Sequence, residues 1–358
     1  MSENVLSIKC PNCGAPLTFS PHDGEVVCQY CDSTFKADVL EKLFKDSLEE
    51  EQGVDWGDVT PGSAWDEDEE NAFQVYSCPS CGAEIICDEN TVATTCVFCG
   101  NPTVLNGRLQ GTLKPDYIIP FRKTKEDAIA ALKNLYKGKR LLPKVFSEQN
   151  HIEEIKGIYV PFWLFDSGVD AKFVFDATRS SVVMTDDADI TTINHYRVER
   201  EGTMHFDKIP VDGSTKMEDR YMDAIEPFNY EDLVPFNRGY LPGYLAEKYD
   251  VDAQASEDRV SERIFNSARM ATERTLAYDQ YFVTHQSLNL FDHSAKYALL
   301  PVWMLTTRWK GETYMFAMNG QTGRMIGDLP VSKGRAAAWF GGITGVCFAI
   351  FAALAMLV

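Results

Sequence analysis

The sequence predicts a multidomain protein with two small ribbon modules, an α+β domain rich in antiparallel strands and a C-terminal transmembrane helix. Three observations lead to this fold class. One four-cysteine pattern occurs twice near the N-terminus, aromatic and β-branched residues alternate through the middle of the chain, and the last 23 residues carry no charge. The expected parts are residues 1–35, 36–75, 76–104, 112–332 and 336–358.

The two cysteine repeats have identical spacing. Each reads Cys-x2-Cys-x14-Cys-x2-Cys and opens with Cys-Pro-x-Cys-Gly-Ala. Two Cys-x-x-Cys turns on facing hairpins bring four sulfurs to tetrahedral positions about 2.3 Å from a zinc ion. The spacing therefore predicts two rubredoxin-like zinc ribbons, at 1–35 and 76–104, each with one closed structural Zn²⁺ site. Iron or a redox dithiol is the alternative. The predicted ligands are Cys10, Cys13, Cys28 and Cys31 in the first site and Cys78, Cys81, Cys96 and Cys99 in the second.

The remaining two of the 10 cysteines are Cys87 and Cys347. Because the other eight form metal-spaced pairs, the pattern favours metal binding in a reducing compartment over a disulfide scaffold. Cys87 lies within the second repeat, where it could compete for the metal or serve as a small buried hydrophobic residue, and we expect the latter. The first ten residues contain no apolar run that would indicate a signal peptide.

Residues 36–75 predict a short helix followed by an acidic linker. The linker contains Gly, Pro and Ser and no basic residue between positions 50 and 71, which is typical of a solvated connection. Trp56 and Trp65 are unusual in such a segment. We expect them to dock onto the chain itself, and docking onto a partner is the alternative.

The region 112–332 combines helices with aromatic strands. Thr124 and Asp127 form a capping-box pattern before a helix that Gly138 would end, and Ser256 with two acids opens a second helix. Residues 157–179 and 296–323 read as two strand pairs with turn residues. The similarity of Pro161-Phe162-Trp163 to Pro301-Val302-Trp303 indicates two related hairpins, by internal duplication or by chance.

The uncharged tail at 336–358 predicts a transmembrane helix, because 23 helical residues span about 34 Å and a hydrocarbon core is about 30 Å thick. A buried core helix is the alternative. Lys333 and Arg335 precede the run, so the positive-inside rule predicts a single-pass protein of the cytoplasmic membrane with the bulk of the chain in the cytoplasm. Gly341-x-x-x-Gly345 is a helix-pairing pattern that would allow an oligomer in membrane lipid.

Charge and motif content restrict the function. The formal net charge is −19, and neither repeat has a Lys or Arg between its first and last cysteine, which argues against nucleic acid as a partner. The sequence contains no phosphate-binding loop, no G-x-S-x-G and no H-E-x-x-H. These observations predict a protein that is not an enzyme.

The order of motifs resembles a known family. Tandem "CPxCGA…CxxC" repeats, an acidic linker, "IIPF", "GIYVPFW", "LLPVW", "NGQTG", "GDLP" and an apolar tail resemble the bacterial TFIIB-type zinc-ribbon membrane proteins, over nearly the whole chain. That family is associated with phage-shock-protein-A-like and flotillin-like (SPFH) membrane-stress proteins.

The resemblance implies a non-enzymatic, membrane-anchored zinc-ribbon adaptor that recruits or scaffolds cytoplasmic membrane-stress proteins. Its partners would be cytoplasmic or membrane proteins, including those of the two associated classes. A membrane-tethered nucleic-acid-binding or transcription-related zinc-ribbon protein is the alternative function, and a basic ribbon face would support it.

Overall fold

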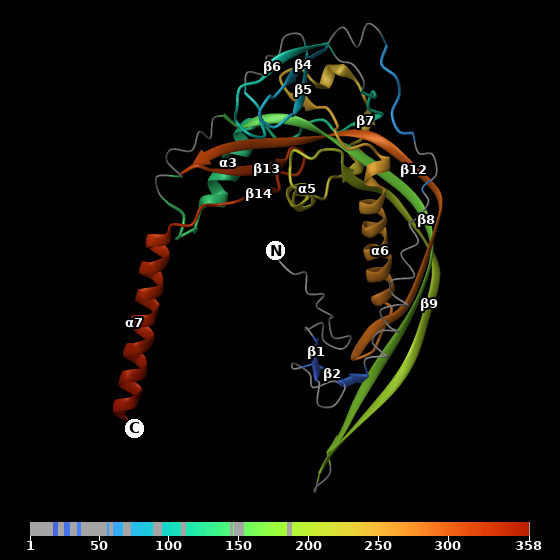
Figure 1. Cartoon of the computed structure of the whole chain (residues 1–358), viewed down its shortest axis with the longest axis vertical. Coiled ribbons are helices and arrows are strands. Elements are labelled where there is room, and N and C mark those ends of the chain that lie inside the picture. Colours follow the sequence, from blue (N-terminus) through green and yellow to red (C-terminus); the bar gives the residue numbers. More distant parts are fainter. Residues whose placement is uncertain are drawn as a thin grey trace. The chain divides into compact units, whose positions relative to one another are not determined.

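The computed structural model describes residues 17–20, 25–28, 34–36, 56, 60–66, 73–88, 95–108, 112–143, 146, 154–184 and 188–357 (Figure 1). The short helix predicted within 36–75 lies outside these residues. The strands are β1 Leu17–Ser20, β2 Glu25–Cys28, β3 Thr34–Lys36, β4 Phe73–Ser77, β5 Glu84–Asp88, β6 Val104–Arg108, β7 Tyr117–Ile118, β8 Lys156–Met184, β9 Asp189–Asp212, β10 Val234–Pro235, β11 Leu245–Glu247, β12 Gln280–Trp309, β13 Glu312–Asn319 and β14 Met325–Gly327. The α-helices are α3 Lys125–Tyr136, α5 Asp219–Ile225, α6 Glu257–Glu273 and α7 Lys333–Leu357.

Eleven of these strands form one sheet. Eight run in the order β10-β7-β12-β8-β11-β5-β4-β6, and β13, β14 and β9 join through β12, β13 and β8 respectively. A separate antiparallel sheet contains β1, β2 and β3. The long strands β8 and β12 are neighbours in the large sheet.

The predicted fold class is wrong in its separation of the second ribbon from the rest of the chain. The structure is mostly β, and the second cysteine unit contributes β4, β5 and β6 to the eleven-stranded sheet. Backbone pairing accounts for this, because β5 pairs with β11 as well as with β4, so its second edge is used within the chain. Independent ribbons would leave that edge unpaired.

The predicted transmembrane helix at 336–358 is also wrong, and with it the single-pass membrane localisation. Of the helices in the described part of the chain, none combines the length and the apolarity that crossing a membrane requires. Absence of charge is a weaker condition than apolarity, and residues 336–345 are largely alanine and glycine, which bring little apolar surface. The expected flanking groups have other contacts: the Arg335 guanidinium donates to the Leu142 carbonyl, and Arg140 lies over the Trp339 ring.

The chain divides into two units, each made of segments that are not consecutive. One unit contains Met1–Asp58, Phe165–Ile209 and Glu257–Ser294, and the other contains Val59–Leu164, Pro210–Ser256 and Ala295–Val358. The second unit holds β4, β5 and β6 together with the four cysteines of the second repeat. The predicted domain boundaries stay predictions.

Two halves of the large sheet repeat the same order of elements. The first half runs β7-α3-β8-β9 and the second runs β11-α6-β12-β13. Each half supplies the short strand that lies parallel to the long strand of the other, since β7 pairs with β12 and β11 pairs with β8. Neither half could therefore complete its own sheet.

Equivalent hydrogen bonds support this repeat. The Gly213 amide donates to the Pro161 carbonyl at 2.9 Å, and the Gly320 amide donates to the Pro301 carbonyl at 2.8 Å. The indole N–H groups of Trp163 and Trp303 each donate to a backbone carbonyl at 2.9 Å. Bonds at matching positions favour internal duplication over chance for the two Pro-x-Trp hairpins.

Both helices predicted in the region 112–332 are present. Thr124 and Asp127 form the expected capping box of α3, and Gly138 has a φ of +74°, which ends the helix at the expected place. α6 begins after Ser256 and buries Val260 and Ile264 on one face. Local sequence signals were sufficient for these elements because helix caps involve neighbouring residues.

Both linker tryptophans are docked within the chain, as expected. Trp56 is 1% exposed, packs edge-on against Phe165 and His293, and donates to the Ser261 hydroxyl at 3.0 Å. Trp65 packs edge-on against Phe73 and Phe236. Burial of large aromatic rings stabilises these contacts.

The Trp56 contact can be tested by truncation. Trp56→Ala should lower the free energy of unfolding by about 3–5 kcal/mol, because it leaves a cavity and removes a hydrogen bond. Trp56→Phe keeps most of the ring and should cost less. Urea denaturation followed by circular dichroism measures both, and an alanine variant as stable as wild type would show that this tryptophan does not anchor its segment.

Candidate metal centre

The turn after β4 presents the first pair of the second cysteine set. The Cys78 amide donates to the Ala83 carbonyl at 2.9 Å, and the Gly82 amide donates back to the Cys78 carbonyl at 2.8 Å. Gly82 has a φ of +73°, a conformation that glycine adopts without strain. The Cys-Pro-Ser-Cys-Gly sequence therefore folds into a tight turn that points Cys78 and Cys81 toward one side.

The second turn repeats this geometry. The Cys96 amide donates to the Asn101 carbonyl at 2.8 Å, the Gly100 amide donates to the Cys96 carbonyl at 3.0 Å, and the φ of Gly100 is +70°. Two turns of one design thus face each other, one following β4 and the other preceding β6.

The four sulfurs meet at one point. Cys78 Sγ lies 3.5 Å from Cys99 Sγ, and Cys81 Sγ lies 3.6 Å from Cys96 Sγ. All four lie within 4.8 Å of one another, and none forms a disulfide. A tetrahedral zinc site with bonds of about 2.3 Å has sulfurs about 3.8 Å apart. This cluster could hold one metal ion with four protein ligands.

Burial and hydrogen bonding affect the thiols differently. Burial raises the pKa of the Cys96 thiol and, less strongly, that of Cys81. Burial also acts to raise the pKa of Cys99, but hydrogen bonds from the backbone of Asn101 and from Cys78 outweigh it and lower this pKa to about 7. Metal binding must deprotonate the cysteines, so loading of the site releases protons.

Asn101 positions the Cys99 ligand. Its side-chain amide donates to Cys99 Sγ at 3.3 Å and to the Ser80 hydroxyl at 2.7 Å. The Arg308 guanidinium donates at 3.3 Å to both the Asn101 side-chain oxygen and the Cys99 carbonyl. Outer contacts of this kind orient metal ligands and tune their charge.

Basic residues that are distant in the sequence lie around the four cysteines. The sequence analysis did not predict them. Lys156 donates to the Thr95 carbonyl at 3.2 Å, and although burial lowers its pKa, the charges of Glu154 and Cys96 oppose that shift. A hydrogen bond to Asp250 raises the pKa of Lys216, with a smaller contribution from Cys81. The charge of a loaded site would therefore be balanced locally, although no Lys or Arg lies between the ligands in sequence.

The second turn is anchored in a hydrophobic core. Val97 and Phe98, the two residues between Cys96 and Cys99, are buried in the same cluster as Tyr221 and Ile225. Cys87 belongs to this cluster as well and is absent from the metal group, so the expectation of a small buried hydrophobic residue is confirmed. The apolar character of the two residues between Cys96 and Cys99 is the feature of the sequence that could have predicted this burial.

The first cysteine set lies mostly outside the part of the chain that the structure describes. Cys10, Cys13 and Cys31 lie outside the described residues, and Cys28 ends β2. The backbone nearby nevertheless repeats the second set. Val27 pairs with Thr34, and the residues at the same positions of the second repeat, Thr95 and Pro102, form a bridge.

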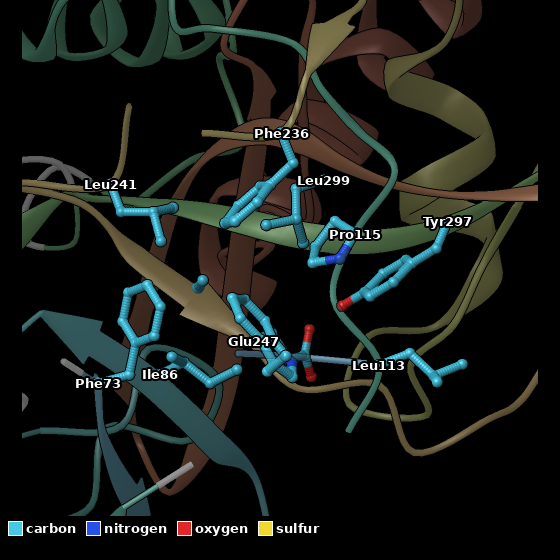
Figure 2. A pocket seen from close by; sticks show the side chains of 11 residues that line it. Phe73, Ile86, Leu113, Pro115, Phe236, Leu241, Glu247, Tyr297 and Leu299 are labelled. Atoms are coloured by element: carbon cyan, nitrogen blue, oxygen red, sulfur yellow. The ribbon is translucent and has the colours of Figure 1, made fainter. Parts of the chain in front are cut away.

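A small pocket in the same unit contains a buried acid (Figure 2). Glu247 is 1% exposed, and its Oε1 accepts a hydrogen bond from the Ser214 hydroxyl at 2.6 Å, whereas Oε2 has no partner within the described part of the chain. In Figure 2 the Tyr297 hydroxyl points toward this carboxyl group. The cavity measures about 10 Å³, room for about one water molecule.

The lining of this pocket is otherwise apolar or aromatic, and it includes Trp65, Phe73, Phe236 and Leu299. A catalytic site of the usual kind needs several converging polar groups, and Glu247 is the one acid among these lining residues. The expectation that the protein is not an enzyme stays a prediction.

Comparison with known proteins places the chain in a family. YdjG of Bacillus subtilis (strain 168) is 34% identical over 345 residues, which cover 96% of each chain. The chain belongs to the YdjG family. YdjG is itself described as uncharacterized, no family model matches the chain, and no solved structure matches it. Membership of the YdjG family therefore brings no assigned activity with it.

The metal ligands of this YdjG-family chain can be tested against a matched cysteine. Cys99→Ser should remove one metal ion per chain and destabilise β4–β6, because metal binding contributes folding energy. Cys87 is a buried cysteine that does not belong to the four-cysteine metal group, so the Cys87→Ala variant should keep the metal. Elemental analysis of purified protein measures both, and equal loss in the two variants would contradict the assignment.

The raised pKa of the buried Glu247 leads us to predict that the folding stability of the protein depends on pH. Burial is the main cause that raises this pKa from 4.5 to about 8; the charges of Asp250 and Asp212 add to this shift, whereas the hydrogen bond from Ser214 and the charge of Lys216 oppose it. The folded chain thus holds one proton more than the unfolded chain between these values. The stabilisation from this group is complete below pH about 4.5 and is lost as pH rises through about 8.

Glu247→Gln mimics the protonated acid and should therefore remove the loss of folding stability that the wild type shows as pH rises. The stability advantage of the variant over wild type should grow by up to about 1.4 kcal/mol per pH unit between pH 5 and 8. Urea denaturation across this range measures it, with the exposed Glu199→Gln as control. Parallel pH profiles for wild type and Glu247→Gln would rule out a buried proton on Glu247.

Proposed function

We propose that this chain is a non-enzymatic zinc-ribbon adaptor that recruits or scaffolds membrane-stress proteins of the phage-shock-protein-A-like and flotillin-like (SPFH) classes. The observation that carries the proposal is an apolar strand edge held next to a closed four-cysteine centre. β6 is the last strand in the order of the large sheet, and Val104 and Leu105 on it are 60% and 53% exposed.

The centre makes this edge rigid. Cys99 precedes β6 closely, and β6 pairs with β4, which leads into Cys78. A metal ion bound by both turns would tie the two strands together at this end. Exposed edge strands with apolar side chains are sites where a partner segment can add to a sheet. A rigid edge loses less entropy on binding than a flexible one.

Zinc is the metal that fits the centre best. Four thiolates in a closed tetrahedral arrangement suit zinc, with iron as the competing choice, and they leave no open coordination position for catalysis. The matched pairings Val27–Thr34 and Thr95–Pro102 support a second zinc site on Cys10, Cys13, Cys28 and Cys31. Both ions would then serve structure.

The basic residues near the centre favour a protein partner over nucleic acid. Lys216 forms an ion pair with Asp250 at 2.7 Å, and Arg308 and Lys156 bond to the turns themselves. Groups used in this way are poorly placed to bind phosphates. The net charge of −19 would instead attract partners with basic surfaces.

Metal content tests the structural part of the proposal. Purified full-length protein should contain two zinc ions per chain, and Cys13→Ser should leave one. Elemental analysis that finds iron, or a single zinc unaffected by Cys13→Ser, would contradict the second zinc site.

Co-purification tests recruitment. Tagged full-length protein, expressed in its own organism, should retain the phage-shock-protein-A-like and SPFH proteins. Leu105→Asp should reduce that recovery at least tenfold while metal content stays constant, because a charge then faces the docking edge. Val331→Asp, at an apolar residue exposed elsewhere in the same unit, is the matched control. Retention by both variants would exclude the β6 edge, and salt-dependent binding to DNA would favour the nucleic-acid alternative.

A further inference from the structure

A second open edge lies on β9, in the other unit. Among the strands that the structure describes, β9 pairs with β8 alone. Every residue from Asp189 to Arg197 is exposed. An edge strand of this length offers a row of backbone donors and acceptors to another chain.

Charge is distributed unevenly along this edge. From Arg197 to Lys208 the strand is rich in charged side chains, and Lys208 has a φ of +56°, two features that discourage strand addition. Residues 190–196 carry no acid, Lys or Arg, and three of them are large exposed apolar or aromatic residues: Ile190, Ile193 and Tyr196. The unprotected part of the edge is therefore confined to one stretch of seven residues.

This stretch is complementary to itself in antiparallel orientation. With Ile193 opposite Ile193 of a second copy, Asp189 comes opposite Arg197, and Thr191 opposite His195, on the same face. The other face pairs Ile190 with Tyr196 and Thr192 with Asn194. Opposite charges and aromatic–aliphatic neighbours are favourable cross-strand pairs.

The two-fold arrangement explains why the acid and the base lie at equal distances from Ile193. In an isologous contact each residue pair occurs twice, so one Asp and one Arg give two ion pairs. A partner of unrelated sequence would not require this symmetry. We propose that two copies of the chain pair antiparallel through β9, with Ile193 on the two-fold axis.

A cysteine placed on the axis tests the register directly. Facing Cα atoms in antiparallel strands are about 4.5–5.5 Å apart, which is within disulfide range. Ile193→Cys should therefore cross-link the full-length chain to a dimer under mild oxidation, in a Cys347→Ser background that removes a thiol exposed among the described residues. Thr191→Cys, on the same face, would lie about 14 Å from its copy and should not cross-link.

Charge reversal provides an independent test. Arg197→Asp places two acids opposite each other at both ends of the contact, so the dissociation constant should rise at least tenfold in sedimentation experiments. Adding Asp189→Arg restores opposite charges and should restore dimers. Circular dichroism of each variant checks that folding is unchanged.

The outcomes separate clearly. A dimer that cross-links at position 193, fails to cross-link at 191 and recovers on charge exchange supports the proposal. A monomer at tens of micromolar, a dimer whose cross-linking does not depend on position, or a double variant that stays monomeric would overturn it. None of these results depends on the metal centre or on the β6 edge.

Discussion

The pairing of β11 on both of its sides is the interaction on which the structure of the cysteine-bearing unit depends. β11 has three residues, yet it lies antiparallel to β5 and parallel to β8, and thereby joins the strands next to the cysteine turns to the long strands of the sheet. Without it, β4–β6 would be a small ribbon with its own open edges. Because β11 is paired on both sides, the metal centre becomes part of a large core.

This central position also accounts for the unusual state of Glu247. The residue ends β11 inside the sheet, where its carboxyl group is buried next to aromatic rings in a cavity with room for about one water molecule. A neutral acid is the less costly form in such surroundings. The junction between β5 and β11 thus contains a proton-dependent group close to the candidate metal centre, because Glu247 pairs with Ile85 and the neighbouring Glu84 pairs with Ser77, which precedes Cys78.

The two open edges suggest a division of roles. β6 lies beside the metal centre in one unit, and its exposed apolar side chains suit a partner of different sequence. β9 belongs to the other unit, and its self-complementary stretch suits a second copy. In these two proposals, pairing of copies and recruitment of partners use separate surfaces, so a dimer would present two recruiting edges.

Local signals in the sequence determined the turns and caps. The spacing of Cys78, Cys81, Cys96 and Cys99, the glycines after each pair and the Thr124 cap involve neighbouring residues, so they could be predicted. Tertiary structure alone decided that β5 joins β11, that Glu247 is buried and that Lys156, Lys216 and Arg308 surround the cysteines, because these contacts join segments far apart in the chain. The uncharged tail failed as a predictor for a related reason: a run without charge does not establish how apolar a helix is or which groups its ends contact.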